Sequence, residues 1–135
     1  MIDYEQNKKY IDFANRILSA DFNATPSVTI SNVDENGEIL AVVIYTRFSK
    51  HNCEMSIATS GHKNWASKRF LKACYAYVFY QCGLKRITVV VDENNNQSIT
   101  MCKKLGHVKE GILHSWFGET NGVIFRMKKE ECKWL

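Results

Sequence analysis

Residues 83–111 read GLKRITVVVDENNNQSITMCKKLGHVKEG, and this stretch decides the fold. Residues 86–91 (RITVVV) form a short and almost wholly apolar run, which is typical of a strand buried on both faces of a sheet. A polar loop follows, and residues 97–105 predict a short helix that stops at Gly106. Lys109 and Glu110 then lead into another strand. The stretch therefore predicts a strand, a helix and a second strand.

The flanking segments extend this pattern in both directions. Residues 65–82 carry a wide apolar stripe and end at Gly83, which predicts an amphipathic helix. Residues 4–18 also have helical spacing, with Asp3 as the expected N-cap. Strands are predicted at residues 27–33, 38–48, 52–59, 108–117 and 123–128, with hairpin turns at DENG and GETNG. The order α, β, β, β, α, β, α, β, β predicts an α/β (mixed α+β) fold with a mixed, mostly antiparallel sheet around a βαβ unit.

Length and composition limit the possible classes of protein. A chain of 135 residues, 45% hydrophobic and 12% aromatic, fits a single folded domain spanning 1–135. No apolar run approaches the roughly 20 residues of a membrane span, and no signal peptide is evident, so a cytoplasmic location is expected. Five cysteines without a paired spacing predict reduced thiols and no metal site. A net charge of +4 suits an anionic ligand but is too small and too dispersed to favour nucleic acid.

Residues 54–111 resemble the RimJ/RimL-like branch of the Gcn5-related N-acetyltransferases (GNAT superfamily). The matching residues occur in order and at the family's spacing: Gly83, Leu84, Arg86, Ile87, Asn95, Ser98, Leu105, Gly106, Glu110 and Gly111. The resemblance implies the GNAT fold, with a βαβ cofactor-binding unit flanked by helices. It also implies direct transfer of an acetyl group from acetyl-CoA to an amine, with a protein N-terminus or lysine as the expected acceptor. Domains this small also occur in bacteriophage genomes, which would place the protein in a host cytoplasm.

The family's phosphate loop falls on residues 62–67, at His62, Lys63, Asn64, Trp65, Ala66 and Ser67. Two residues depart from the family pattern, because His62 replaces Arg or Gln and Trp65 replaces the first glycine. Lys63, Lys68 and Arg69 crowd a helix start, where cations oppose the helix dipole unless an anion is bound. A solvated basic face is the alternative interpretation of these residues.

Further cofactor contacts follow from the same resemblance. The end of the preceding strand, Ile57, Ala58 and Thr59, corresponds to the backbone that pairs with the pantetheine arm. Asn95 corresponds to the asparagine that contacts this arm, although it also fits a simple cap of the following helix. Ser98 lies one helical turn before Cys102, the residue that replaces the family's tyrosine acid.

Amide formation needs a neutral amine and a proton for the departing thiolate. Glu54 and Glu110 are the two candidate bases, and Cys102 is the candidate acid, with Ser98 as its alternative. His107 replaces the family's phenylalanine and is interpreted as a packing residue; a nucleophilic Cys102–His107 pair is a minor alternative. Each carboxylate could equally be an ordinary strand-edge residue.

Two other functions compete with acetyl transfer. One is a catalytically weak CoA-binding or protein-interaction module on the same fold. The other is an RNA-binding α+β domain that uses Trp65 as a stacking platform beside basic side chains. The identity of the acceptor and the choice between monomer and homodimer remain open from the sequence.

Overall fold

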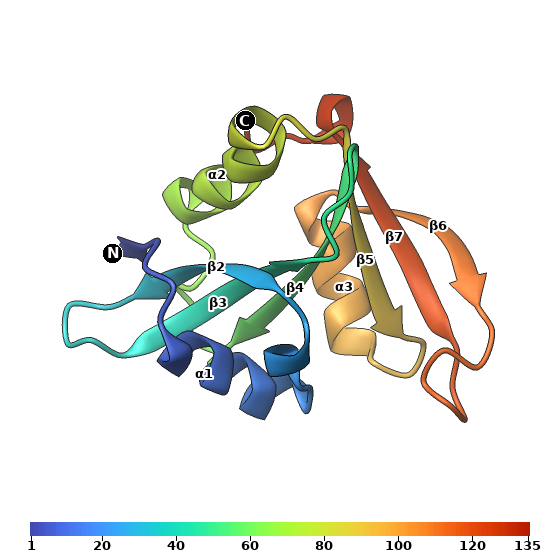
Figure 1. The fold of residues 1–135 in the computed structure, drawn as a ribbon, viewed down its shortest axis with the longest axis horizontal. Helices are drawn as coiled ribbons and strands as arrows, with labels where there is room; N and C mark the ends of the chain where they lie inside the picture. Colours follow the sequence, from blue (N-terminus) through green and yellow to red (C-terminus); the bar gives the residue numbers. More distant parts are fainter.

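The computed structural model describes residues 1–135, which fold around a seven-stranded sheet of order β1-β2-β3-β4-β5-β7-β6 (Figure 1). The strands are β1 (Ile2–Asp3), β2 (Ser27–Val33), β3 (Ile39–Thr46), β4 (Asn52–Thr59), β5 (Arg86–Asp92), β6 (Val108–Leu113) and β7 (Gly122–Lys128). The helices are α1 (Lys8–Leu18), α2 (Lys68–Ala76) and α3 (Asn96–Leu105). A π-helical turn, Tyr77–Gln81, continues α2, and 3₁₀ turns lie at Phe22–Ala24 and Lys129–Glu131. The predicted α/β class and mostly antiparallel sheet are confirmed.

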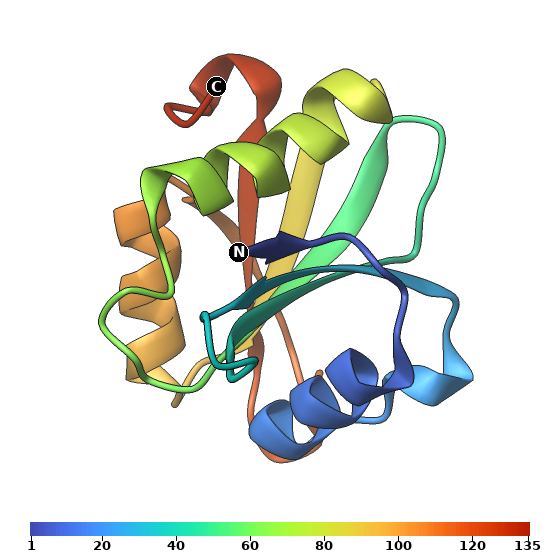
Figure 2. The same cartoon turned by 90° about the vertical axis from the view of Figure 1, so that its left-hand side faces the viewer.

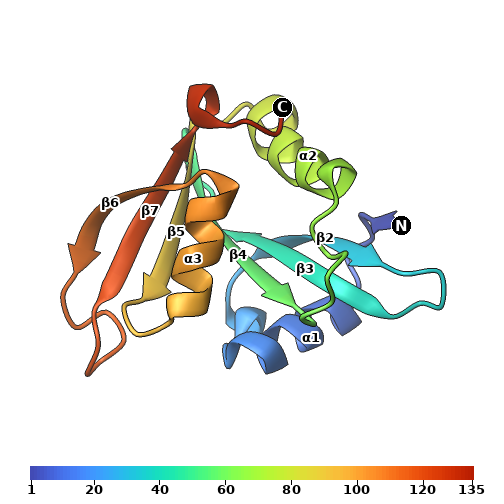
Figure 3. The same cartoon turned by 180° about the vertical axis from the view of Figure 1, so that it is seen from behind.

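The sheet consists of two halves that are joined only at one end. β4 and β5 are the only parallel neighbours, and they pair over three positions, from Asn52 with Arg86 to Glu54 with Thr88. Beyond Glu54, β4 pairs only with β3, whereas β5 beyond Thr88 pairs only with β7. Figures 1 and 3 show the two strands meeting at one end and separating toward their carboxyl ends, with α3 beside the opening.

The side chains of β3 alternate between the two faces of the sheet, and this alternation explains which helix covers which face. Val43 and Tyr45 belong to a large buried cluster that includes α2, whereas Val42 and Ile44 belong to a smaller cluster that includes α1. Successive side chains of a strand point to opposite faces, so α1 and α2 must cover opposite faces. Figure 2 shows this arrangement.

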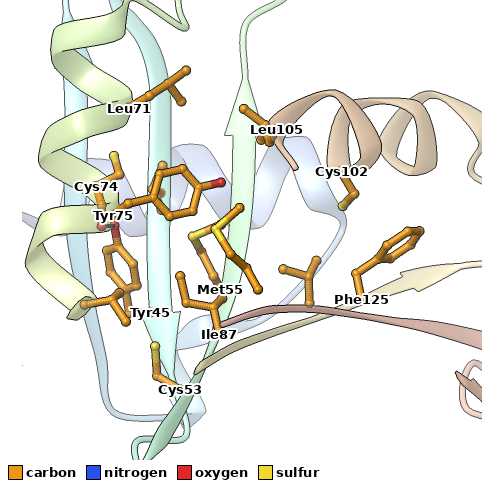
Figure 4. Close-up of a cluster of buried hydrophobic side chains, with 14 of the residues drawn as sticks. Tyr45, Cys53, Met55, Leu71, Cys74, Tyr75, Ile87, Cys102, Leu105 and Phe125 are labelled. Carbon is orange, nitrogen blue, oxygen red and sulfur yellow. Dashed lines mark hydrogen bonds between the residues drawn. The ribbon is translucent and has the colours of Figure 1, made fainter. Parts of the chain in front are cut away.

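The larger cluster ties α2 and α3 to both halves of the sheet (Figure 4). Its 21 buried residues include Met55 of β4, Ile87 of β5, and Cys102 and Leu105 of α3. The hydroxyl of the fully buried Tyr45 donates to the carbonyl of a residue in α2, Cys74, over 2.7 Å. The separation of β4 and β5 is therefore bridged by packing on one face rather than by strand pairing.

Three predicted boundaries need correction. The first helix begins at Lys8 rather than near residue 4, and its N-cap is Asn7, because Ile2 and Asp3 form an edge strand that pairs with β2. The second helix begins at Lys68 rather than at residue 65, because Ser67 caps it by accepting the N–H of Phe70. β6 ends at Leu113 rather than at residue 117, and the chain turns through Ser115, whose φ is 56°.

Candidate functional site

A cleft of about 700 Å³ lies where β4 and β5 separate. Residues 55–57 of β4 and 89–92 of β5 form its walls, and α3 closes one side. The segment that follows α1 borders the cleft together with Phe117. Crevices beyond the carboxyl ends of parallel strands are the usual ligand sites of α/β sheets, and this volume lies in the range of small-molecule sites.

The edge of β4 that faces this cleft has no strand partner beyond Glu54. Exposed strand edges can pair with an extended chain through backbone N–H and C=O groups. Of the three predicted contact residues, Ile57 lines the cleft, whereas Ala58 is fully buried in the α1 cluster and Thr59 ends the strand. Ala58 can therefore contribute only its backbone to a ligand.

The predicted phosphate loop lies between β4 and α2, and part of its backbone is already hydrogen bonded. The hydroxyl of Thr59 accepts the N–H of Gly61 over 2.9 Å, and Nδ1 of His62 accepts the N–H of Asn64 over 3.1 Å. The N–H groups of Lys68 and Arg69 at the start of α2 have no protein acceptor. These two free donors and the nearby basic side chains make the start of α2 suitable for an anion.

Trp65 and Asn32 hold this loop in place. The side chain of Trp65 is half-buried against the larger core cluster. The backbone carbonyl of Trp65 accepts a hydrogen bond from the Nδ2–H of Asn32 over 2.9 Å. Asn32 is a buried polar residue of β2, 6% exposed. Trp65 thus has a packing role at a position where the family has glycine. The contribution of Asn32 had no signal in the sequence.

The first two turns of α3 and its N-cap place three predicted residues along the cleft. The side-chain oxygen of Asn95 caps the helix by accepting the N–H of Ser98 over 3.1 Å, and both residues line the cleft. One turn later lies Cys102, which also lines the cleft and is 5% exposed. Burial raises the pKa of the Cys102 thiol to about 11, so this group is protonated at neutral pH.

Glu54 lies at the point where β4 and β5 separate. It lines a smaller hollow of about 220 Å³, which shares Phe22, Met55 and Phe117 with the large cleft. Asp21, Arg47 and Trp116 also line this hollow. A carboxylate oxygen of Glu54 lies 3.2 Å from Nε of Arg47, whose own backbone has a left-handed φ of 50°. Glu54 is therefore a carboxylate beside the cleft with a single protein cation as its partner.

Glu110 does not line the cleft. It lies at the irregular register between β6 and β7, where its carboxylate is 2.8 Å from Nη2 of Arg86 and 3.6 Å from Nη1 of Arg126. The hydrogen bond from Arg86 lowers the pKa of Glu110, and the charge of Arg126 adds to this effect. Arg86 is the first residue of β5, whereas the cleft begins at Val89. Glu110 therefore lies in an ion-pair network outside the cleft, and its role as an acceptor-side base stays a prediction.

His107 lines the cleft and is more than a packing substitute for phenylalanine. It is 4% exposed, and Nε2 of its ring is 2.8 Å from the hydroxyl of Tyr75 in α2. Its other ring nitrogen, Nδ1, has no hydrogen-bond partner. No hydrogen bond links His107 to the thiol of Cys102, so the structure does not form the alternative Cys–His pair.

Two further features were compared with the structure: metal-ligand clusters and membrane-spanning helices. No group of three His, Cys, Asp or Glu residues is arranged to hold a metal ion. No helix is both long and apolar enough to cross a bilayer.

The whole chain is similar in structure to solved acetyltransferases. A spermidine N-acetyltransferase from Vibrio cholerae, in complex with CoA and spermine, matches with a TM-score of 0.76 and 13% identity over 97% of this chain and 96% of that chain. A ribosomal-protein-S5-alanine acetyltransferase from Vibrio fischeri matches with a TM-score of 0.70 and 16% identity over 98% and 94% of the two chains. A GNAT-family acetyltransferase from Bacillus anthracis matches with a TM-score of 0.64 and 18% identity over 89% and 73%.

Comparisons of the sequence alone gave no match. No protein-family model matches the chain, and no curated protein matches it. The structural similarity to the two Vibrio enzymes nevertheless extends over nearly the full length of both chains. The chain therefore has the GNAT acetyltransferase fold.

Proposed function

We propose that the protein is an N-acetyltransferase that moves the acetyl group of acetyl-CoA to an amine, with a protein or peptide amine as the acceptor. The observation that carries this proposal is the cleft between the separated strands, which has the unpaired edge of β4 on one wall and adjoins a hollow lined by the carboxylate Glu54. The solved structures with a similar fold include enzymes that are named for acetyl transfer to a polyamine and to a ribosomal protein.

The start of α2, the cleft and the adjoining hollow offer a separate place for each part of acetyl-CoA. The pyrophosphate is anionic and suits the start of α2, where Lys63, Lys68 and two free N–H groups lie. The pantetheine arm is an extended chain with amide groups, which suits the unpaired edge of β4 beside Ile57. The thioester would then lie near the point where β4 and β5 part, between Cys102 and Glu54.

The reaction needs the amine nitrogen to attack the thioester carbonyl carbon. A C–N bond forms, the C–S bond breaks, CoA leaves as a thiolate, and the amine loses one proton. In this proposal Glu54, which lines the adjoining hollow, accepts that proton directly or through a water molecule. Cys102 is a weak acid for the thiolate, because its pKa of about 11 lies above the value of about 8.5 for an ordinary thiol. Most of the rate enhancement should therefore come from positioning and from Glu54.

The small hollow beside Glu54 is the proposed acceptor site. Its volume of about 220 Å³ suits one amine-bearing chain rather than a folded surface. Asp21 and Glu54 supply negative charge for an ammonium group, and the exposed rings of Trp116 and Phe117 could cover the chain that carries it. An extended peptide end or a lysine side chain fits this description.

A CoA-binding module without useful catalysis is the second candidate. The observation that favours it is the ion pair between Arg47 and Glu54, since a base held by a guanidinium is less available to an amine. The RNA-binding alternative loses its main support, because Trp65 is half-buried against the core rather than displayed as a stacking platform.

Release of free thiol from acetyl-CoA in the presence of an amine panel distinguishes these candidates. Peptides with a free N-terminus, lysine peptides with a blocked N-terminus, and polyamines would form the panel. An acetyltransferase releases thiol only when an acceptor is present. A module binds CoA, as seen by calorimetry, but releases no thiol with any amine.

A further inference from the structure

Tyr75 and His107 form a polar pair inside the larger hydrophobic core. Tyr75 is 1% exposed and His107 is 4% exposed, and the two side chains come from α2 and from the residue that follows Gly106 at the end of α3. Nearly all buried polar atoms in proteins have a hydrogen-bond partner. Here Nε2 of His107 has one in the Tyr75 hydroxyl, whereas Nδ1 has none.

The hydrogen bond between Tyr75 and His107 fits either tautomer of the histidine, and each tautomer leaves a different donor unpaired. The Tyr75 hydroxyl makes no hydrogen bond other than the one to His107. Its own proton needs an acceptor, and Nε2 can accept only if it is unprotonated. Burial lowers the pKa of His107 to about 4, so the ring is neutral at pH 7 and has one proton. When the Tyr75 hydroxyl donates to Nε2, that proton is on Nδ1, which makes Nδ1–H a buried donor without an acceptor. In the other tautomer, the Tyr75 O–H is the donor without an acceptor.

The surroundings of His107 indicate what could satisfy the Nδ1–H donor. His107 lines the cleft beside the apolar Met101 and Leu105 of α3. No lysine or arginine lines the cleft, and its single carboxylate, Asp92, already accepts the N–H of Asn94 and the hydroxyl of Thr120. Without a cation nearby, an anionic ligand group would be poorly stabilised there. A neutral acceptor on a largely apolar chain, such as an amide carbonyl, is the complementary group.

We propose that Nδ1–H of His107 donates a hydrogen bond to an amide carbonyl of the ligand in the cleft, and that Tyr75 positions this donor by fixing the histidine tautomer. The inference rests on the proposed function, because the pantetheine arm of CoA has two amide groups on an otherwise flexible chain. His107 thereby becomes a specificity-determining residue for the arm rather than for the nucleotide. Phenylalanine at this position could provide packing but no donor.

Calorimetry with two probes tests the proposal. Coenzyme A has the amide-bearing arm, whereas adenosine 3′,5′-bisphosphate has only the nucleotide end. His107→Phe should weaken CoA binding about tenfold, because the amide carbonyl of CoA is then buried against an apolar surface without a donor. The affinity for the bisphosphate should not change. His51→Phe, an exposed residue outside the cleft, is the matched control and should change neither affinity.

Nitrogen-15 NMR of the wild-type protein provides a second readout that does not depend on the folding of a variant. The free protein should show the Nδ1–H tautomer, and CoA should shift the Nδ1 proton downfield. Tyr75→Phe should give a mixture of tautomers. Two results would overturn this inference alone. One is an Nε2–H tautomer whose ring signals do not shift when CoA is added. The other is equal affinity of His107→Phe and the wild type for CoA. Absence of CoA binding by the wild type would overturn the proposed function and this inference with it.

Discussion

Reversing two charges at the start of α2 should weaken CoA binding by about 2 kcal/mol, or about 30-fold. Lys63 and Lys68 are both exposed, so water screens their interaction with a bound pyrophosphate. Unit charges about 4 Å apart in water interact by about 1 kcal/mol, and changing lysine to glutamate replaces attraction by repulsion of similar size. Flexible exposed side chains realise only part of that difference, which leaves roughly 1 kcal/mol for each residue.

The assay is calorimetric titration of Lys63→Glu/Lys68→Glu with CoA at two salt concentrations. The Debye length falls from about 10 Å at 0.1 M salt to about 3 Å at 1 M, so the defect should shrink at high salt. Lys50→Glu/Lys109→Glu is the matched control, because both residues are exposed and neither borders the cleft or the loop. Each substitution subtracts two charges, so both pairs lower the net charge from +4 to zero.

This comparison separates a phosphate site from a general charge effect. A 30-fold loss confined to the Lys63/Lys68 pair would support an anion at the start of α2. Equal affinities of the two double variants, or no change in either at 0.1 M salt, would refute the reasoning and leave these lysines as a solvated surface.

Three further predictions concern individual side chains. Glu54→Gln should lower turnover at pH 7 by about 100-fold while CoA affinity stays within twofold, and the loss should diminish at high pH, where the acceptor amine is already neutral; an unchanged kcat would eliminate Glu54 as the base. Cys102→Ala should reduce kcat by tenfold at most, because its pKa of about 11 makes it a poor acid; a loss above 100-fold in a folded variant would contradict this. His107 has a folded pKa of about 4 against an ordinary value of 6.5, so its contribution to stability is present above pH 6.5 and is lost as the pH falls toward 4. Between pH 7 and pH 4 the free energy of unfolding should decrease by about 2–3 kcal/mol more in the wild type than in His107→Phe, as measured by urea denaturation, and parallel pH profiles would be inconsistent with a buried neutral ring.

Residues 83–111 could be interpreted well from sequence because their signals are local. The apolar run at residues 86–91 marks β5, Asn95 provides the cap of α3, and Gly106 with φ of 101° ends that helix. Each feature depends on neighbours within a few residues, so composition and spacing were sufficient. Asn95 as a helix cap is confirmed, and this role leaves its amide nitrogen free for a ligand.

The features that escaped prediction depend on contacts between distant residues. Asn32 and Trp65 are 33 residues apart, and Tyr75 and His107 are 32 apart, yet each pair is joined by a hydrogen bond. Nothing in the local pattern marks Asn32 as a support for the loop. The edge strand β1 is similar, because two residues become a strand only through pairing with β2.

The surroundings of Glu110 also depend on strand pairing that the sequence does not show. The position of Glu110 in a Lys–Glu–Gly motif indicated a place near the acceptor, and the irregular pairing between β6 and β7 at this point sets it beside Arg86 and Arg126. A single-residue shift of register changes which face a side chain occupies, and sequence spacing does not reveal such a shift. Glu54, by contrast, was placed correctly on β4 because the strand is regular throughout.

The central claim, acetyl transfer to an amine, is tested most directly by mass spectrometry with carbon-13 acetyl-CoA. The purified protein would be incubated with the labelled thioester and the amine panel, and Glu54→Gln would be run in parallel. We expect label on the nitrogen of at least one amine, matched by an equal amount of free CoA, at a rate that falls about 100-fold in the variant. Binding of CoA without labelling of any amine above the protein-free background would contradict it and would favour the binding module.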